Sequence, residues 1–386
     1  MASERKLHAN EDRRFHGESV DYPFLFLILL LLTVGLVMLY SASFAQSQYD
    51  TGYTVSTKYL QKQAICTVIG LVAMYLFSRI PSAFWYRMAW PFYGISIVLL
   101  LSVLVMGQEV NGAKRWINIA GIQFQPSEVA KFAQILLFAR LTRLYGQNAK
   151  QFRYGVLGFG MALLGILVPL ALEKHLSAIM LMGMVAVVMM YVAGTDPRWL
   201  LAGAAAAAVF VILYISFMGY AGDRVTAWLH PERDPGDTGY QILQSLYAIG
   251  SGGLFGLGFG KSRQKYLYLP FQYNDYIFAV CCEELGLMGA AAIVFLFAAT
   301  ILRGYWIALQ ARDRFSTVLA AGLVTLIAGQ TVLNLCVVTN LLPSTGIALP
   351  FFSYGGTALA VNLGEMGIVL QISRQRNQRK IQEEIL

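Results

Sequence analysis

Charged side chains are scarce in this chain of 386 residues, because Asp, Glu, Lys and Arg together make up 13% of it. A soluble domain typically contains about 25% of these residues. Hydrophobic residues make up 57% of the chain, and its mean hydropathy is +0.57. This composition excludes a disordered or collagen-like chain, argues against a soluble enzyme and indicates a membrane protein.

Cysteine and histidine are also rare, with four of each. The cysteines lie in apolar stretches without a Cys-x-x-Cys spacing: Cys66, Cys281, Cys282 and Cys336. Their placement argues against a disulfide framework and against a zinc site. The histidines are scattered, so the sequence contains no helical histidine pair to hold a metal.

Long apolar runs are abundant. A helix needs about 20 mostly apolar residues to cross a bilayer. Ten stretches meet this need, at roughly 22–45, 60–78, 87–106, 126–144, 154–172, 176–193, 199–218, 275–302, 315–338 and 356–373. Because backbone groups in lipid must be paired within the chain, we predict an all-α bundle of ten transmembrane helices. A large extracytoplasmic loop, about 219–274, would join the seventh and eighth spans.

The basic residues orient this bundle, since Lys and Arg gather on the cytoplasmic side of membrane proteins. With the N-terminus inside, 18 of the 29 Lys and Arg residues fall in cytoplasmic segments. We therefore predict a cytoplasmic N-terminal tail (1–21), a membrane domain (22–373) and a cytoplasmic C-terminal tail (374–386). The net charge of +8 then reflects topology, and we expect no nucleic-acid partner.

The first span has an alternative interpretation as a signal peptide. A basic head, an apolar run and Ser43-Phe44-Ala45 resemble such a peptide with its cleavage site. The apolar run is longer than the usual 7–15 residues of a signal peptide. Without this span, the number of crossings would no longer match the side on which the Lys- and Arg-rich segments fall. We interpret the first span as a retained anchor.

Polar chemistry gathers in three segments assigned to the outer side. The first contains Arg115 and then the start of the fourth span, where Pro126 is followed by Glu128 and Lys131. Glu128 and Lys131 are three residues apart and share one helix face. Charges within a span are costly and indicate a function by default. The alternative is an ion pair that only makes both charges tolerable.

The second segment is the long loop, in which we expect a short helix around Thr238–Ile249 that carries Gln241 and Gln244. Three basic residues follow a glycine-rich run at 251–260: Lys261, Arg263 and Lys265. The N–H groups of such a turn and these side chains suit a phosphate. A flexible loop whose basic residues meet lipid headgroups fits the sequence at least as well.

The third segment, 334–356, contains two prolines, three glycines and Ser353 between apolar spans. This pattern predicts a re-entrant, non-helical stretch. Irregular backbone is tolerated at membrane depth only against protein or a cavity.

Acidic residues mark the eighth span. Asp275 opens this span, where a helix cap and a catalytic group are equally consistent with its position. Glu283 and Glu284 follow on different helix faces, so we expect one of them to face the interior of the bundle.

Taken together, these residues resemble the SEDS proteins (shape, elongation, division and sporulation), a family of ten-span peptidoglycan glycosyltransferases. The resemblance covers nearly all of the chain and rests on motifs in the family's order: Met38–Ser43, Lys114–Ile117, Gln125–Glu128, Gly239–Gln241, Gln264–Pro270, Asp275–Ala279, Glu283–Gly286 and 343–356. The form of Gly260–Lys265 is more similar to the division and sporulation branch (FtsW, SpoVE) than to the elongation branch (RodA).

The resemblance implies a glycosyltransferase that polymerises lipid II into glycan strands on the outer face of the bacterial cytoplasmic membrane. It implies that Asp275 is the family's essential aspartate and that Glu128 and Lys131 belong to the family's Pro-Ser-Glu-x-x-Lys motif. The substrate-binding candidates are Arg115, Glu128, Lys131, Gln241, Gln244, Lys261, Arg263, Lys265 and Ser353. It also implies a divalent cation, Mg²⁺ or Mn²⁺, with unknown ligands. The implied partners are a single-span class B penicillin-binding protein and other division or sporulation proteins.

The chain departs from the family at two places. The Glu and His that often precede the catalytic Asp are absent from Pro270–Asp275, and Lys174–Ser177 replaces a frequent Pro-Asp-x-Gly. Two other functions stay open: a lipid II flippase, and an inactive scaffold of the cell-wall synthesis complex. The gathering of polar motifs on one side favours an enzyme, because a transporter's site lies near the midplane.

Overall fold

The computed structural model describes residues 20–110, 113–119, 122–203, 205, 226–233 and 238–375. Its main helices are α2 (Tyr22–Asp50), α3 (Lys58–Phe77), α4 (Ser82–Met106), α5 (Pro126–Tyr145), α6 (Phe159–Leu172), α7 (Leu176–Val192), α10 (Thr238–Gly252), α11 (Ile277–Leu309), α12 (Arg314–Val338) and α13 (Gly356–Arg374). Short 3₁₀ or π turns are η1 (Gly146–Lys150), η2 (Arg153–Gly158) and η3 (Pro231–Arg233). The strands are β1 (Gln108–Val110), β2 (Ala113–Ile119) and β3 (Ile122–Phe124).

Helices occupy every predicted span except the seventh, most of which lies outside the described residues. Six of the described helices are long and apolar enough to cross a membrane, and α7 is a shorter apolar helix. The protein is therefore a multi-pass membrane protein, and the count of ten spans stays a prediction. The short helix expected around Thr238–Ile249 is confirmed as α10.

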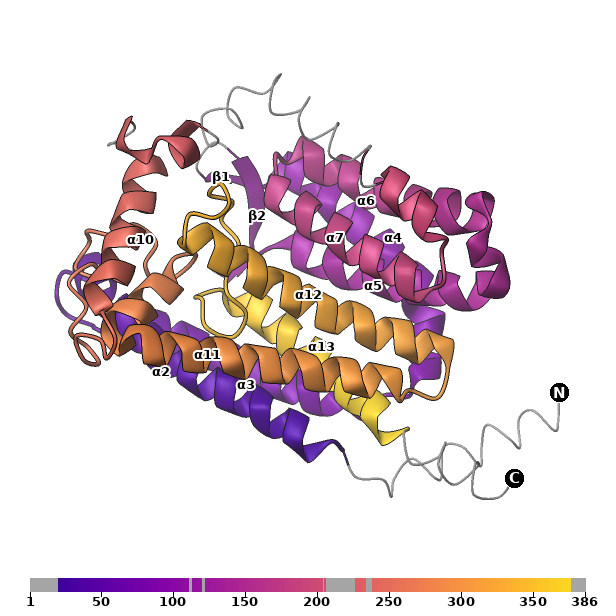
Figure 1. Ribbon diagram of the computed structural model, residues 1–386, viewed down its shortest axis with the longest axis horizontal. Coiled ribbons are helices and arrows are strands. Elements are labelled where there is room, and N and C mark those ends of the chain that lie inside the picture. The colour runs from indigo at the N-terminus through magenta and orange to yellow at the C-terminus, as the bar shows by residue number, and fades with distance from the viewer. Residues whose placement is uncertain are drawn as a thin grey trace.

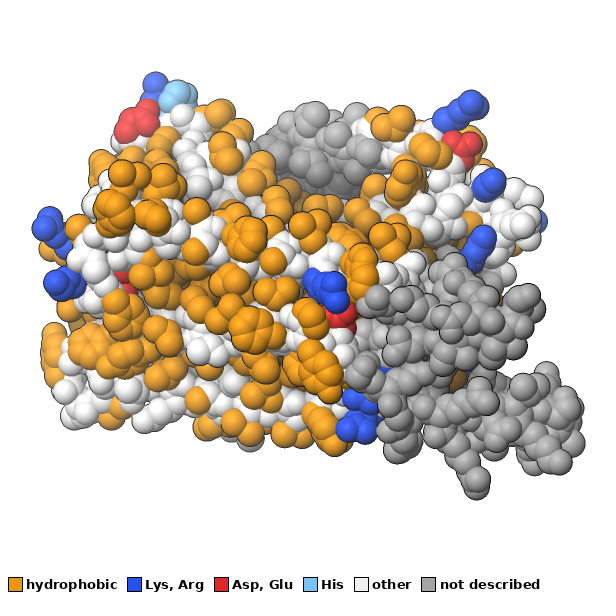
Figure 2. All heavy atoms as spheres, turned by 60° about the horizontal axis from the view of Figure 1, so that its bottom comes forward, with side chains coloured by type: hydrophobic (Ala, Val, Ile, Leu, Met, Phe, Trp, Pro, Cys, Tyr) orange, Lys and Arg blue, Asp and Glu red, His pale blue; other side chains and the backbone are white. Residues whose placement is uncertain are grey.

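The helices lie side by side along the long axis of the molecule (Figure 1), where α11 and α12 are neighbours and α13 lies behind them. α2 and α3 flank one side, and α4 to α7 form a group on the other. Large apolar side chains point outward from these helices, for example Phe26 (63% exposed), Val98 (66%) and Phe295 (70%). Hydrophobic side chains cover most of the face in Figure 2, whereas Lys and Arg lie mostly toward its two ends. A lipid-facing surface has this distribution.

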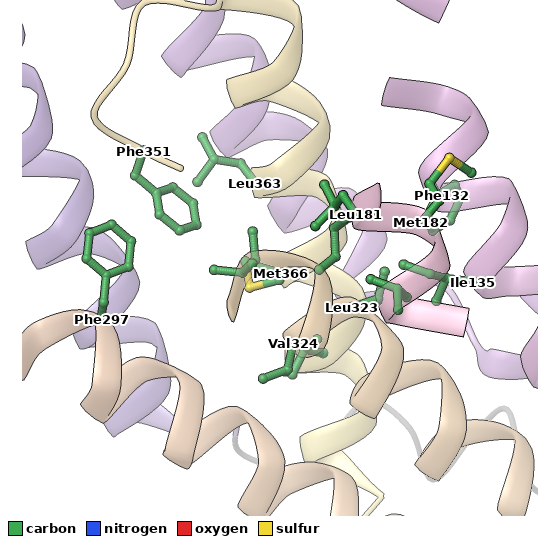
Figure 3. Packing of buried hydrophobic residues seen from close by; sticks show 14 of the residues in the cluster. Phe132, Ile135, Leu181, Met182, Phe297, Leu323, Val324, Phe351, Leu363 and Met366 are labelled. Atoms are coloured by element: carbon green, nitrogen blue, oxygen red, sulfur yellow. The ribbon is translucent and has the colours of Figure 1, made fainter. Parts of the chain in front are cut away.

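The core is centred on α12, because 72% of its most apolar window is buried against 28% in both α4 and α11. Leu323 and Val324 of α12 meet side chains of α5, α7 and α13 there (Figure 3). Phe297 of α11 and Phe351 of the segment before α13 close the other side of this core. The core thus joins helices that are far apart in the sequence.

The described part of the chain is not entirely helical, and this corrects the all-α prediction. β1, β2 and β3 form a small antiparallel sheet, in which Val110 pairs with Ala113 and Ile119 with Ile122. Two-residue connections of this kind are typical of β-hairpins. The apolar-run criterion cannot detect strands of 3 to 7 residues.

A break in α11 at Gly286 corrects the expectation for Glu283 and Glu284. Gly286 has φ 67° and ψ −170°, which interrupts the helix. The glycine-rich loop enters there: the N–H groups of Leu257 and Gly258 donate to the carbonyls of Glu283 and Glu284, at 2.9 and 3.0 Å. Because this loop covers the helix, both carboxylates are buried, at 1% exposure each.

Candidate active site

Asp275 lies in the irregular segment before α11 and is half-buried. α11 begins at Ile277 with Tyr276 at its N-cap position, one residue after Asp275. Its Oδ2 lies 3.3 Å from where a Cβ atom would stand at Gly346, whose φ is +66°. Glycine at this position permits the backbone conformation and leaves space beside the carboxylate.

Asn334 near the end of α12 and the segment between α12 and α13 hold the backbone at Asp275 in place. This segment, 339–355, contains no helix, as predicted, whereas 334–338 of the predicted stretch still belongs to α12. Asn334 Nδ2 donates to the carbonyl oxygens of Asp275 and Ile347, both at 2.7 Å. Ser353 Oγ donates to the Asn274 carbonyl at 2.7 Å and accepts from the Leu349 N–H at 2.7 Å. Ser353 is 5% exposed and acts here as a positioning residue.

Three tyrosine rings pack against one another near Asp275. Tyr59 lies 4.4 Å from Tyr273 and 4.9 Å from Tyr354 between ring centroids. The N–H of Tyr354 donates to the Tyr273 carbonyl at 2.9 Å, which fixes the two segments together. Burial raises the pKa of Tyr273 and of Tyr354, so these phenols stay neutral.

Glu128 and Lys131 pair within the first turns of α5. Lys131 Nζ lies 2.7 Å from Glu128 Oε2, and the two residues are 5% and 7% exposed. Pro126 stands at the first helical position, as expected, without a side-chain cap from Gln125. The predicted i,i+3 pair is thus present, and its function stays a prediction.

Arg115, on β2, reaches the turn between α6 and α7 and donates to the Lys174 carbonyl. Burial raises the pKa of Glu173 to about 8, against the opposing effect of Arg115. Burial, together with the charges of Arg115 and Lys131, lowers the pKa of His175 to about 3. Near neutral pH the imidazole is therefore uncharged and the Glu173 carboxyl is mostly protonated.

A chain of contacts joins this turn to Asp275. Ser177 Oγ donates to the carbonyl of Thr345, whose neighbour Gly346 faces the Asp275 carboxylate. Three buried polar atoms along this route have no hydrogen-bond partner within the described residues: Glu173 Oε1, His175 Nδ1 and Thr345 Oγ1. Such atoms suit a polar ligand, because burying them unpaired is costly.

The structure separates the three basic residues of the long loop. Lys261 and Arg263 are exposed, whereas Lys265 is 2% exposed and its Nζ lies 2.8 Å from Glu284 Oε1. Ser41 Oγ joins this pair from α2. Lys265 is therefore committed to a buried ion pair, which corrects its grouping with the exposed phosphate candidates.

Glu283 binds the same loop through hydrogen bonds to residues 262–264. Its carboxylate accepts from the backbone N–H groups of Arg263 and Gln264, at 3.0 and 3.3 Å, and from Ser262 Oγ. Gln241 and Gln244 lie on α10 and are half-buried. The loop is thus anchored on α11 through Glu283 and Glu284.

Glu173 and His175 are the site residues that sequence reasoning missed as candidates. The signal was available, since two ionisable residues sit between two apolar spans where they must be satisfied or functional. No group of three or more His, Cys, Asp or Glu side chains gathers as a metal site in the part of the chain that the structure describes.

Comparisons with known proteins agree with this arrangement. A family model described as cell cycle protein, covering FtsW, RodA and SpoVE, matches residues 22–378. A Geobacter sulfurreducens protein named probable peptidoglycan glycosyltransferase FtsW is 38% identical over 361 residues, covering 92% of this chain and 95% of that one. Stage V sporulation protein E of Bacillus subtilis is 38% identical over 362 residues, covering 92% and 97%.

Solved structures share the fold. A chain from a peptidoglycan synthase complex, reported for its coordination of polymerization and crosslinking, superposes with a TM-score of 0.78 at 28% identity, covering 93% of this chain and 99% of that one. The rod shape determining protein RodA of Thermus thermophilus gives a TM-score of 0.69 at 27% identity, covering 93% and 98%. The names FtsW and SpoVE at the higher identity confirm the predicted branch. The chain belongs to the FtsW/RodA/SpoVE family, the SEDS proteins that its motifs indicated.

Proposed function

We propose that this protein is a peptidoglycan glycosyltransferase that polymerises lipid II on the outer face of the bacterial cytoplasmic membrane, in cell division or sporulation. Relatives with that activity in their names, at 38% identity over most of the chain, support the reaction. The observation that carries the proposal is Asp275, a half-buried carboxylate just before α11 whose backbone is held by Asn334 and, through Asn274, by Ser353.

In the proposed reaction, a sugar hydroxyl of the acceptor attacks the anomeric carbon of the donor. A new carbon–oxygen bond forms, the bond to the diphosphate breaks, and undecaprenyl diphosphate leaves. Asp275 accepts the hydroxyl proton as general base. Gly346 leaves space beside its Oδ2 for the acceptor.

Positive charge stabilises the leaving diphosphate in this scheme. Arg115 and Lys131 supply it near the α6–α7 turn. His175 adds a neutral imidazole there, whose buried Nδ1 has no hydrogen-bond partner in the described part of the chain. Lys261 and Arg263 are exposed and suit the first capture of an anionic headgroup. Lys265 instead keeps the loop on α11 through Glu284.

A divalent cation belongs to the proposal as well. Mg²⁺ is usually held by one or two carboxylates together with substrate phosphates, so a three-ligand protein site is not needed. The diphosphate oxygens would hold it, and the bound ion would neutralise charge on the leaving group.

The orientation in the membrane is proposed from the distribution of Lys and Arg. Both termini would lie in the cytoplasm and the Asp275 end of the bundle outside. A class B penicillin-binding protein is the proposed partner, supported by the similar chain found in a peptidoglycan synthase complex. Other division or sporulation proteins would join through that assembly.

The test uses the full chain in vesicles with lipid II and Mg²⁺, with and without the transpeptidase partner. We expect glycan polymer on a gel, with a higher yield when the partner is present. Headgroup translocation without polymer would establish a flippase instead. Partner binding with neither polymer nor translocation would establish a scaffold.

A further inference from the structure

A pocket of about 380 Å³ lies where the end of α5, the end of α7 and the start of α12 meet. The far ends of the same three helices carry residues of the candidate active site: Glu128 on α5, Ser177 on α7 and Asn334 on α12. The pocket therefore lies at the opposite end of the bundle from Asp275. In the proposed orientation this end faces the cytoplasm.

Two basic side chains line this pocket, Lys150 from the turn η1 after α5 and Arg314 from the first position of α12. Both are exposed, and neither has an ion-pair partner in the part of the chain that the structure describes. The rest of the lining is neutral: Thr142, Gly146, Gln147, Val192, Ala193, Gly194, Thr317 and Val318. A recess lined in this way attracts an anion.

Two acids lie close to this pocket along the chain, and both have other partners. Asp313 accepts from the Ser316 N–H at 2.7 Å through Oδ1, and its Oδ2 lies 3.8 Å from Arg143 Nη1. Asp196, beyond the end of α7, accepts from the Arg198 N–H at 2.9 Å. The two basic side chains of the lining thus keep their charge for a ligand from outside the chain.

The lining indicates a phosphate ester that also carries hydroxyl groups. Arg and Lys side chains form charge-assisted hydrogen bonds with phosphate oxygens. The Gln147 amide can donate and accept, and the Thr317 hydroxyl, which donates to the Asp313 carbonyl at 3.0 Å, can still accept. The volume lies within the roughly 300–1,000 Å³ of most ligand pockets. A glycerophosphate group combines these chemical features.

The rim of the pocket joins the apolar lateral surface of the bundle. Val192 lines the pocket and is 41% exposed, and its neighbour Tyr191 is 64% exposed. On the α5 side, Leu144 is 54% exposed. A lipid could therefore place its headgroup in the pocket and its acyl chains along this surface. Basic pockets between transmembrane helices on the cytoplasmic side bind anionic lipid headgroups in this way.

We propose that this pocket binds a glycerophosphate group, with Lys150 and Arg314 on its phosphate and Gln147 and Thr317 on its hydroxyls. The apolar rim favours an anionic lipid over a soluble ester as the source of this group. The site lies at the other end of the bundle from the proposed glycosyltransferase reaction, and its test needs no polymerisation.

The test measures the thermal unfolding midpoint of the purified full chain, in a neutral detergent, against ligand concentration. A ligand that binds only the folded state raises this midpoint as its concentration exceeds Kd. The probes are dihexanoyl phosphatidylglycerol, dihexanoyl phosphatidylcholine, which has the same chains but no net charge, and sn-glycerol 3-phosphate, which has no chains. We expect the phosphatidylglycerol to bind at least about tenfold more tightly than the phosphatidylcholine, and this preference to shrink as salt is added. Tighter binding of the phosphatidylglycerol than of glycerol 3-phosphate would identify a lipid as the source, and equal binding a soluble ester.

Variants separate this site from the general attraction of a basic surface. Lys150→Gln/Arg314→Gln should weaken phosphatidylglycerol binding at least about tenfold, because both charge-assisted hydrogen bonds are lost. Arg153→Gln/Arg198→Gln removes the same charge from exposed positions outside the lining and should behave like the wild type. Gln147→Trp keeps the charges, narrows the pocket and should also weaken binding. Equal losses in the two double variants, or equal binding of the two lipids by the wild type, would overturn the proposal.

Discussion

At the scale of single residues, the protein places ionisable groups where their charges must be matched. Lys265 and Glu284 form a buried ion pair that Ser41 completes from α2. Sequence spacing grouped Lys265 with Lys261 and Arg263, because spacing says nothing about which side of a loop is covered. Only the fold of the loop over α11 distinguishes them.

Removing one partner of this pair should be costly. Lys265→Met leaves the Glu284 carboxylate buried without its cation, so we expect a loss of about 3–5 kcal/mol in unfolding free energy. The double variant Lys265→Met/Glu284→Gln should lose less than the sum of the single variants. Thermal unfolding of the purified protein measures these differences. The exposed Lys261→Met is the control, and an equal loss in both lysine variants would refute the assignment.

His175 should make the protein sensitive to acid. Its folded pKa of about 3 lies below the usual 6.5, so its contribution to stability is complete above pH 6.5 and is lost as the pH falls toward 3. At pH 5 the loss should reach about 2 kcal/mol, which follows from 1.5 pH units at about 1.4 kcal/mol each.

Unfolding midpoints at pH 7.5 and pH 5 test this expectation, with His175→Asn as the comparison. The variant should lose less stability between the two pH values than the wild type. Identical losses would show that His175 does not carry the effect.

At the scale of elements, long apolar helices could be predicted and short or broken elements could not. The long apolar runs predicted the positions of α2, α4 and α12 to within five residues at each end, since twenty apolar residues leave few alternatives. The strands β1–β3 were not predicted because each is too short for the apolar-run criterion. The break in α11 was not predicted because it is caused by a loop that is distant in the sequence.

Gly286 is the element-scale position where substitution should matter most. A Cβ there would lie 2.3 Å from the Gly256 nitrogen and 2.6 Å from the Leu254 oxygen, and φ is +67°. Gly286→Ala should therefore lower the unfolding free energy by about 2 kcal/mol or more. Gly250→Ala on α10 is the matched control, since open space surrounds that position among the described residues and alanine favours helices. A thermal unfolding midpoint as high for Gly286→Ala as for Gly250→Ala would contradict the account of this break.

At the scale of the whole molecule, the candidate site is assembled from segments that the sequence keeps far apart. Asp275, Thr345 and Ser177 become neighbours only because α7, α11 and α12 pack around one core. The motifs identified Asp275, Glu128 and Lys131 one at a time. Their neighbours Glu173 and His175 could not be selected as site residues from the sequence, because only the packing shows that both are buried.

Topology is a whole-molecule prediction that labelling can test. In a background without the native cysteines, Lys261→Cys should react with a membrane-impermeant maleimide on intact cells. Gln147→Cys, at the opposite end of α5 from Pro126, should react only after permeabilisation. Both positions are exposed, so access depends on the side of the membrane. Labelling of Gln147→Cys on intact cells would reverse the proposed orientation.

The most direct test of the central claim is the yield of glycan polymer from lipid II, with the transpeptidase partner present, for wild type and Asp275→Ala. Loss of the general base should lower the rate by about 10²-fold or more. Asp196→Ala, which removes an aspartate after α7, should match the wild type. Polymer from wild type and Asp196→Ala but not from Asp275→Ala is the predicted result, and equal polymer from Asp275→Ala would contradict it.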